Sequence, residues 1–116
     1  MVHDISLKIA LDTETLLGPG KADLLEGIRD TGSIAAAGRR MQMSYKRAWQ
    51  LVGTLNACFS EPVVSATRGG AAGGGAQLTR TGHAVLASYR RMQKLTEKAV
   101  AQEIAGLERL MKTKGE

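Results

Sequence analysis

A run of eight residues that contains five glycines, 68–75, constrains the fold of this chain more than any other feature. It begins with Arg68 and lies between two short runs of strand character, residues 63–67 and 76–78. Two strands joined in this way predict a β-hairpin with a long, pliant tip. Because glycine has no Cβ, the backbone of such a tip can approach a large anion closely.

The residues before this hairpin predict two short helices joined by a tight turn. Ser33 can cap a helix over residues 34–41, and Ser44 can cap a second helix over residues 45–59. On the second helix an apolar stripe with helical spacing is expected to be buried, and its members are Ala48, Val52, Leu55 and Phe59. This pattern is typical of a helix-turn-helix, whose second helix enters the DNA major groove by its N-terminal part.

The second helix carries side chains that suit contact with DNA. Lysine and arginine donate to guanine edges or phosphates, glutamine pairs with adenine, and serine and tyrosine hydroxyls bond phosphate oxygens. The predicted base-reading and positioning residues are Ser44, Tyr45, Lys46, Arg47 and Gln50, with Thr54 one turn further along. Trp49 adjoins the buried Ala48, and two interpretations stay open: a half-buried core residue or a groove contact.

Contacts to the DNA backbone are predicted for the arginines and for the glycine-rich tip. The arginines are Arg39, Arg40, Arg68 and Arg80, and the glycines expected against the backbone or minor groove are Gly69, Gly70 and Gly73. The charge distribution supports a polyanionic partner, because residues 1–32 carry a net −3, residues 33–80 a net +5 and residues 81–116 a net +3. A solvated basic surface without a partner is the plainer alternative.

The ends of the chain predict further elements. Alternation from Ile5 to Leu11 predicts a strand, and residues 21–30 predict a helix. Thr79 can cap a final helix over residues 81–111, roughly 45 Å long at ~1.5 Å per residue. So small a domain cannot cover a helix of that length, so we expect a symmetric homodimer. The expected divisions are a DNA-binding domain at 1–80, a dimerisation helix at 81–112 and a frayed tail at 113–116.

Several classes of function are excluded. One cysteine and two histidines allow neither a disulfide nor a metal cluster, so no cofactor is expected. The glycine run lacks the lysine of a nucleotide-binding P-loop. Cys58 would need His83 as a base and is better explained as a packing thiol, so an enzyme is not expected. No signal peptide or long apolar run is present, which predicts a cytoplasmic protein with no membrane partner.

Five short motifs together resemble the N-terminal DNA-binding domain of the ModE family of bacterial, molybdate-responsive transcription regulators. They are Gly32-Ser33-Ile34, Ser44-Tyr45-Lys46-Arg47-Ala48-Trp49, Arg68-Gly69-Gly70, Gly73-Gly74-Gly75-Ala76 and Leu78-Thr79-Arg80-Thr81-Gly82. The similarity spans residues 5–95. A more distant likeness to the helix-turn-helix of LysR-type regulators points the same way.

The resemblance implies a mainly α winged helix-turn-helix with a small β-hairpin and a long C-terminal dimerisation helix. It also implies binding to a palindromic double-stranded operator. ModE proteins usually continue into β domains that bind molybdate, for which 116 residues leave no room, so any response to molybdate is expected to be indirect. The rival hypothesis is a dimerising interaction protein that modulates a full-length regulator through mixed dimers.

Overall fold

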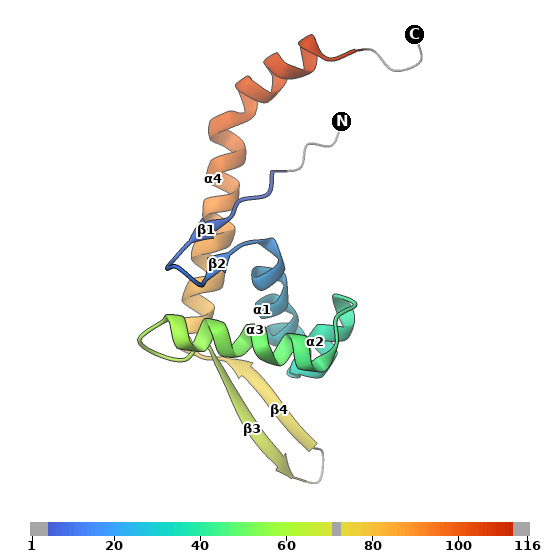
Figure 1. Cartoon of the computed structure of the whole chain (residues 1–116), viewed down its shortest axis with the longest axis vertical. Helices are drawn as coiled ribbons and strands as arrows, with labels where there is room; N and C mark the ends of the chain where they lie inside the picture. Colours follow the sequence, from blue (N-terminus) through green and yellow to red (C-terminus); the bar gives the residue numbers. More distant parts are fainter. Residues whose placement is uncertain (1–4, 71–72, 113–116) are drawn as a thin grey trace.

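The computed structural model describes residues 5–70 and 73–112, so the tail predicted to fray, 113–116, lies outside the described residues. The described part is mainly α with two small antiparallel strand pairs (Figure 1). The helices are α1 (Pro19–Thr31), α2 (Ile34–Arg40), α3 (Tyr45–Cys58) and α4 (Arg80–Leu110), and the strands are β1 (Ile9–Ala10), β2 (Leu16–Leu17), β3 (Val64–Gly70) and β4 (Gly73–Leu78).

The predicted N-terminal strand is shorter than its alternating pattern suggests. Side chains from Ile5 to Ala10 alternate between half-buried and exposed as expected, yet only Ile9–Ala10 is paired, with β2. The preceding residues lie along α4 instead, where the buried Tyr89 donates its hydroxyl to the Leu7 carbonyl at 2.6 Å. An alternating apolar pattern indicates that one face of an extended segment is buried, and a helix can cover that face as well as a neighbouring strand can.

The first three helices pack through small residues. A Cβ added to Gly27 of α1 would lie 3.0 Å from the Ala37 Cβ, and one added to Gly38 of α2 would lie 3.2 Å from the Ala48 Cβ. The alanine-rich α2 therefore lets both neighbouring helices approach closely. The core between these helices is aliphatic, and Leu24, Leu25, Ile28 and Leu55 are fully buried in it.

The hairpin follows α3 and is longer than expected. β3 and β4 pair antiparallel from Val64 opposite Leu78 to Gly70 opposite Gly73, with an irregular register between Thr67 and Gly70. The prediction of a loop over residues 68–75 is wrong in extent, since strand structure continues to Gly70 and resumes at Gly73. A ladder needs only backbone groups, so glycines can take part once a partner strand is in register.

α4 leaves the hairpin without a linker. Thr79 accepts from the Gly82 amide at 3.0 Å and donates its hydroxyl to the Pro62 carbonyl at 2.6 Å. A Cβ at Gly82 would overlap the Val63 carbonyl oxygen, so only glycine permits this approach. The helix then runs well beyond the other elements, and the molecule is elongated, 61 × 32 × 23 Å (Figure 1).

Candidate nucleic-acid interface

The α2–turn–α3 unit is built from local capping interactions. Ser33 accepts from the Ala36 amide at 3.0 Å, and Ser44 accepts from the Arg47 amide at 3.1 Å, so both predicted N-caps are confirmed. Between the helices Gln42 has φ 57°, the one positive φ among the described non-glycine residues. This left-handed residue lies in the turn that follows α2, and α3 begins three residues later, at Tyr45.

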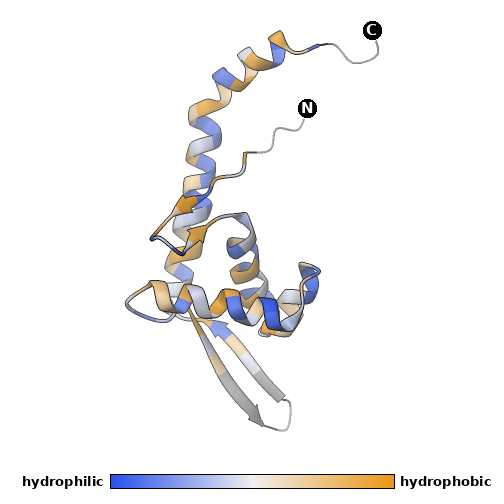
Figure 2. Ribbon diagram, viewed as in Figure 1, coloured by the Kyte–Doolittle hydropathy of each residue, from blue (hydrophilic) through white to orange (hydrophobic). Residues whose placement is uncertain are grey.

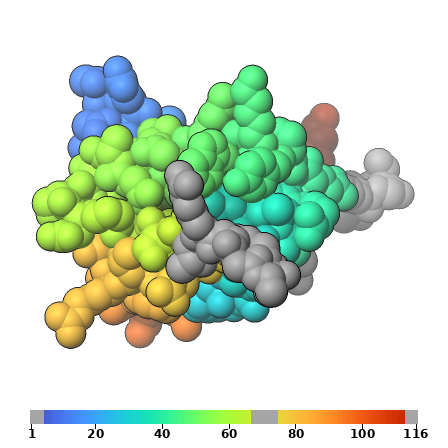
Figure 3. Space-filling view, turned by 90° about the horizontal axis from the view of Figure 1, so that it is seen from below, coloured from blue at the N-terminus to red at the C-terminus, as the bar shows by residue number. Residues whose placement is uncertain are grey.

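The predicted contact residues lie together on the outer side of α3. Its first two turns expose Tyr45, Lys46, Arg47, Trp49 and Gln50, while the stripe of Ala48, Val52 and Leu55 is buried and Phe59, just past the helix, is half-buried. Thr54 is half-buried and donates its hydroxyl to the Gln50 carbonyl at 3.1 Å. Figure 3 shows α3 crossing the hairpin side of the molecule, with α2 beside it.

The structure places Trp49 on the surface. Half of its area is exposed, and its ring stacks on that of Tyr45 with centroids 6.4 Å apart and an interplanar angle of 13°. Tyr45 is 57% exposed. Trp49 therefore has half of its area covered without belonging to the hydrophobic core, and its contact with DNA stays a prediction.

Hydrogen bonds to the end of α1 and to Asn56 of α3 hold the hairpin in place. The Ala76 amide donates to the Gly32 carbonyl at 2.9 Å, and Gly32 itself ends α1 in the left-handed region, with φ 71°. Asn56 of α3 accepts from the Val63 amide at 2.8 Å and donates to the Val64 carbonyl at 3.2 Å. A groove of about 260 Å³ lies between hairpin, α2 and α3. Its walls are Ser33, Ile34, Ala35, Tyr45, Trp49, Ala66, Gly75 and Ala76.

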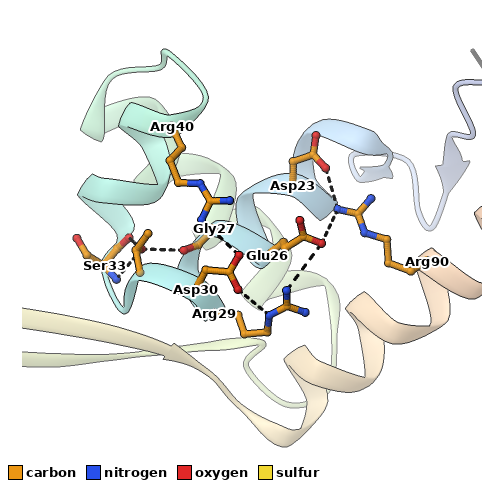
Figure 4. Close-up of polar contacts among 9 residues, drawn as sticks. Asp23, Glu26, Gly27, Arg29, Asp30, Ser33, Arg40 and Arg90 are labelled. Atoms are coloured by element: carbon orange, nitrogen blue, oxygen red, sulfur yellow. Dashed lines mark hydrogen bonds and ion pairs between the residues drawn. The ribbon is translucent and has the colours of Figure 1, made fainter.

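The basic side chains near the turn differ in whether they form ion pairs. Arg39, Lys46 and Arg47 are exposed and form no ion pair within the part of the chain that the structure describes. Arg40 instead lies 3.4 Å from a carboxylate oxygen of Asp30 on α1 (Figure 4). Hydrogen bonds from Arg29 and then Arg40 lower the pKa of Asp30, so it stays ionised and offsets part of the positive charge.

The two remaining predicted arginines are not brought to the start of α3. Arg80 is exposed at the first residue of α4 and lines a groove with Phe59, at the opposite end of α3 from Tyr45. The side chain of Arg68 lies outside the described residues. The backbones of Gly69, Gly70 and Gly73 belong to the paired strands. Phosphate contacts by these residues stay predictions.

Sequence reasoning missed residues that position the interface rather than form it. Helical spacing does not reveal the role of Asn56, because its partners at residues 63 and 64 lie beyond the end of α3; the signal is an asparagine near a helix end just before a strand. The Arg40–Asp30 pair joins α2 to α1, and no local motif marks it.

Other kinds of site find no support. Burial raises the pKa of the Cys58 thiol, which disfavours a reactive thiolate and agrees with a packing role. No cluster of three or more metal-ligating side chains occurs in residues 5–70 and 73–112. Among the same residues, no helix combines the length and apolarity needed to cross a membrane.

Comparison with known proteins identifies relatives over most of the chain. It is 42% identical over 84 residues to the molybdenum-pterin-binding protein MopA of Rhodobacter capsulatus, covering 72% of this chain and 32% of MopA. It is 40% identical to the molybdenum transport protein ModE of Azotobacter vinelandii, covering 74% of this chain and 33% of the relative. With ModE of Escherichia coli K12, a DNA-binding transcriptional dual regulator, it shares 31% identity over 85% of this chain and 38% of the relative.

The chain thus spans about a third of the length of the curated relatives it matches. None of these relatives is named as an enzyme, in agreement with the expectation of a non-catalytic protein. No protein-family model matches the sequence.

Solved structures confirm the winged helix-turn-helix fold. The DNA-binding domain of CbnR, solved in complex with DNA, superposes with a TM-score of 0.58 at 22% identity, covering 75% of this chain and 94% of that domain. Full-length LysG of Corynebacterium glutamicum, an LTTR with bound arginine, superposes with a TM-score of 0.57 at 25% identity, covering 78% of this chain and 29% of LysG. The predicted fold class, including a long C-terminal helix, is correct.

Proposed function

Because the chain belongs to the ModE family of transcription regulators, we propose that it binds a palindromic operator in double-stranded DNA as a homodimer, in the cytoplasm. The observation that carries this proposal is the exposed, basic N-terminal half of α3, capped by Ser44 and set beside the hairpin. The first turns of such a helix reach base edges in the major groove, while its free amides and neighbouring arginines bind phosphates.

The roles proposed for α2 and α3 follow the placement of their side chains, and those proposed for Arg68 and the hairpin glycines follow from the sequence. Lys46, Arg47 and Gln50 read base edges, and Ser44 and Tyr45 position α3 on phosphates. Arg39 and Arg40 contact the backbone beside α2. Arg68, the hairpin glycines and Arg80 contact the backbone further out. Thr54 stands one turn beyond Gln50, at the edge of the contact.

Selection of bound sequences from a random DNA pool tests operator recognition directly. Enrichment of an inverted repeat, with the logarithm of affinity falling at a slope near −0.9 per contacted phosphate against the logarithm of salt, is the expected result. A pool that stays random after selection, or an affinity independent of salt, would contradict sequence-specific DNA binding.

The dimer is proposed from the uncovered part of α4. Hydrophobic residues recur along α4 to its C-terminal end (Figure 2), and Leu107, Leu110 and Met111 are 62%, 83% and 63% exposed. Val100, Ile104, Leu107 and Met111 follow the alternating spacing of four and three residues that is typical of a coiled-coil seam. A second copy of α4 would cover this stripe, so residues 81–112 form the proposed dimerisation helix.

Leu107→Glu tests the dimer, since it places a charge in the middle of the stripe. We expect the variant to sediment as a monomer at concentrations where the wild type is a dimer, with an unchanged far-UV circular dichroism spectrum. Its affinity for the palindrome should fall by at least tenfold, because one half-site is then bound alone. Leu95→Glu, an exposed substitution outside the four-residue seam, is the matched control and should leave the dimer intact.

The long helix also supports the second candidate, mixed dimers with a full-length regulator. If the chain co-purified with such a regulator and the random pool stayed random, this function would replace operator binding.

Isothermal calorimetry with molybdate tests whether the chain binds this ligand. We expect no heat from the chain alone, because we propose that any response to molybdate is indirect.

A further inference from the structure

Two aromatic residues at the start of α3 expose ring faces that neither the core nor the polar contacts proposed above account for. The chain contains only four aromatic residues. Tyr89 is buried and Phe59 is half-buried, as expected of apolar rings in a small domain. Tyr45 and Trp49 are instead more exposed than most other large apolar side chains within the globular part, on the side of α3 that faces away from the core.

The rings form one continuous apolar surface. They are one helical turn apart, and their near-parallel stacking leaves the remaining ring faces and edges open to solvent. The groove toward the hairpin is walled on its far side by small residues, Ala66, Gly75 and Ala76, so the hairpin does not cover Trp49. Because each ring already restrains the other, docking the pair costs little further side-chain entropy.

The surface lies where the major groove is expected to be. Tyr45 is the first residue of α3, and Trp49 is in its second turn, interleaved with exposed Lys46 and Gln50. The cations bring this face to the DNA, and the aromatic pair must then meet base edges. Most groups at those edges are hydrogen-bond donors or acceptors, and the apolar exception is the C5-methyl group of thymine.

We propose that the stacked Tyr45–Trp49 pair recognises thymine by its C5-methyl group, and so sets sequence specificity at one or two positions of each half-site. This inference rests on the proposed DNA binding. It assigns Lys46, Arg47 and Gln50 to hydrogen-bonded groups on bases, leaves the Tyr45 hydroxyl to a phosphate, and assigns the faces of both rings to the apolar contact. By the same chemistry, 5-methylcytosine at that position is accepted in place of thymine.

The test uses the operator selected from the random pool, with each thymine replaced in turn by deoxyuridine, which removes only the methyl group. Binding of the full chain is measured by fluorescence anisotropy. We expect one or two replacements per half-site to weaken wild-type binding about fourfold, as for burial of one methyl group. Trp49→Ala and Tyr45→Ala should weaken binding to the thymine duplex and bind both duplexes equally. Tyr45→Phe keeps the ring and should keep the discrimination.

The outcomes separate this inference from the function on which it rests. If the wild type selects an operator but tolerates deoxyuridine at every position, the methyl contact is wrong while operator binding stands. Retention of full discrimination by Trp49→Ala and by Tyr45→Ala also overturns the inference, because other groups then read the methyl. If no operator is selected, both proposals fail. Both rings are exposed, and circular dichroism checks that the alanine variants fold.

Discussion

Arginines of the same chemistry have opposite surroundings in two regions of this molecule. Arg90 of α4 is held by two carboxylates of α1, at 2.8 Å from Asp23 and 3.1 Å from Glu26, and 29% of its side chain is exposed (Figure 4). Arg47, at the start of α3, is exposed and has no carboxylate partner among the described residues. One region uses its charge to join two helices. The other leaves its charge available to a partner.

The largest expected effect comes from removing the available charges. Lys46→Ala with Arg47→Ala should reduce affinity for the selected operator by at least thirtyfold, because each base or phosphate contact contributes about 1–3 kcal/mol. The melting temperature should change by less than about 2 °C, since exposed substitutions are nearly neutral. Fluorescence anisotropy measures the affinity for the operator, and thermal melting measures the melting temperature. Unchanged affinity would show that α3 is not the recognition helix.

The converse substitution tests the engaged arginine. Arg90→Ala should lower the free energy of unfolding by about 1–2 kcal/mol, because it removes a shared hydrogen-bonded pair and part of the packing between α1 and α4. Arg91→Ala, at the exposed neighbouring position, is the matched control. Urea unfolding provides the measurement. Equal stability of the two variants would mean that the α1–α4 ion pairs contribute nothing measurable.

Arg40 stands between these extremes, since it is exposed yet paired with Asp30. Asp30→Asn should tighten operator binding about two- to threefold, because it frees Arg40 and removes one repelling charge from the DNA side. The gain should shrink as salt is raised. Glu103→Gln, which changes net charge equally on distal α4, should have less effect, and an equal gain from it would rule out a local cause.

The smallest effect concerns pH. The pKa of Asp30 is lowered below 3.8, so the ionised form is favoured by folding. The contribution is fully present above the unfolded pKa and is lost as pH falls from about 4 through the lowered folded pKa. Asp30→Asn should therefore flatten the acid limb of the stability curve slightly. The group is exposed, and a large change in that limb would contradict a purely local role.

Elements defined by contacts between near neighbours could be predicted from the sequence. Ser33, Ser44 and Thr79 each bond an amide three residues ahead, so the starts of α2, α3 and α4 follow from the local sequence. The buried stripe of α3 follows from helical spacing in the same way. The charged face of α3 was predicted because it is the remainder of that helix surface.

Features that depend on distant partners could not be predicted. Arg90 and Asp23 are 67 residues apart, and nothing in either segment marks the pairing. Gly70 joins a strand only because Gly73 is held opposite it, whereas glycine by itself favours a loop. Trp49 follows the buried Ala48 by about 100° around the helix axis, so its exposure depended on where the hairpin packs.

The close packing at Gly82 would fix how the two DNA-binding domains of a dimer are oriented on the duplex. Only Thr79 separates β4 from α4, and Gly82 in the first turn of α4 packs against the Val63 carbonyl. The orientation of α4 relative to the DNA-binding domain is therefore fixed. Two domains joined through α4 would hold their α3 helices in a fixed rotational phase around the duplex. Each base pair turns the duplex by about 34–36°, so inserting or deleting one between the half-sites would carry one of them out of reach. Affinity would then depend on the number of base pairs between the half-sites as strictly as on the sequence of each half-site.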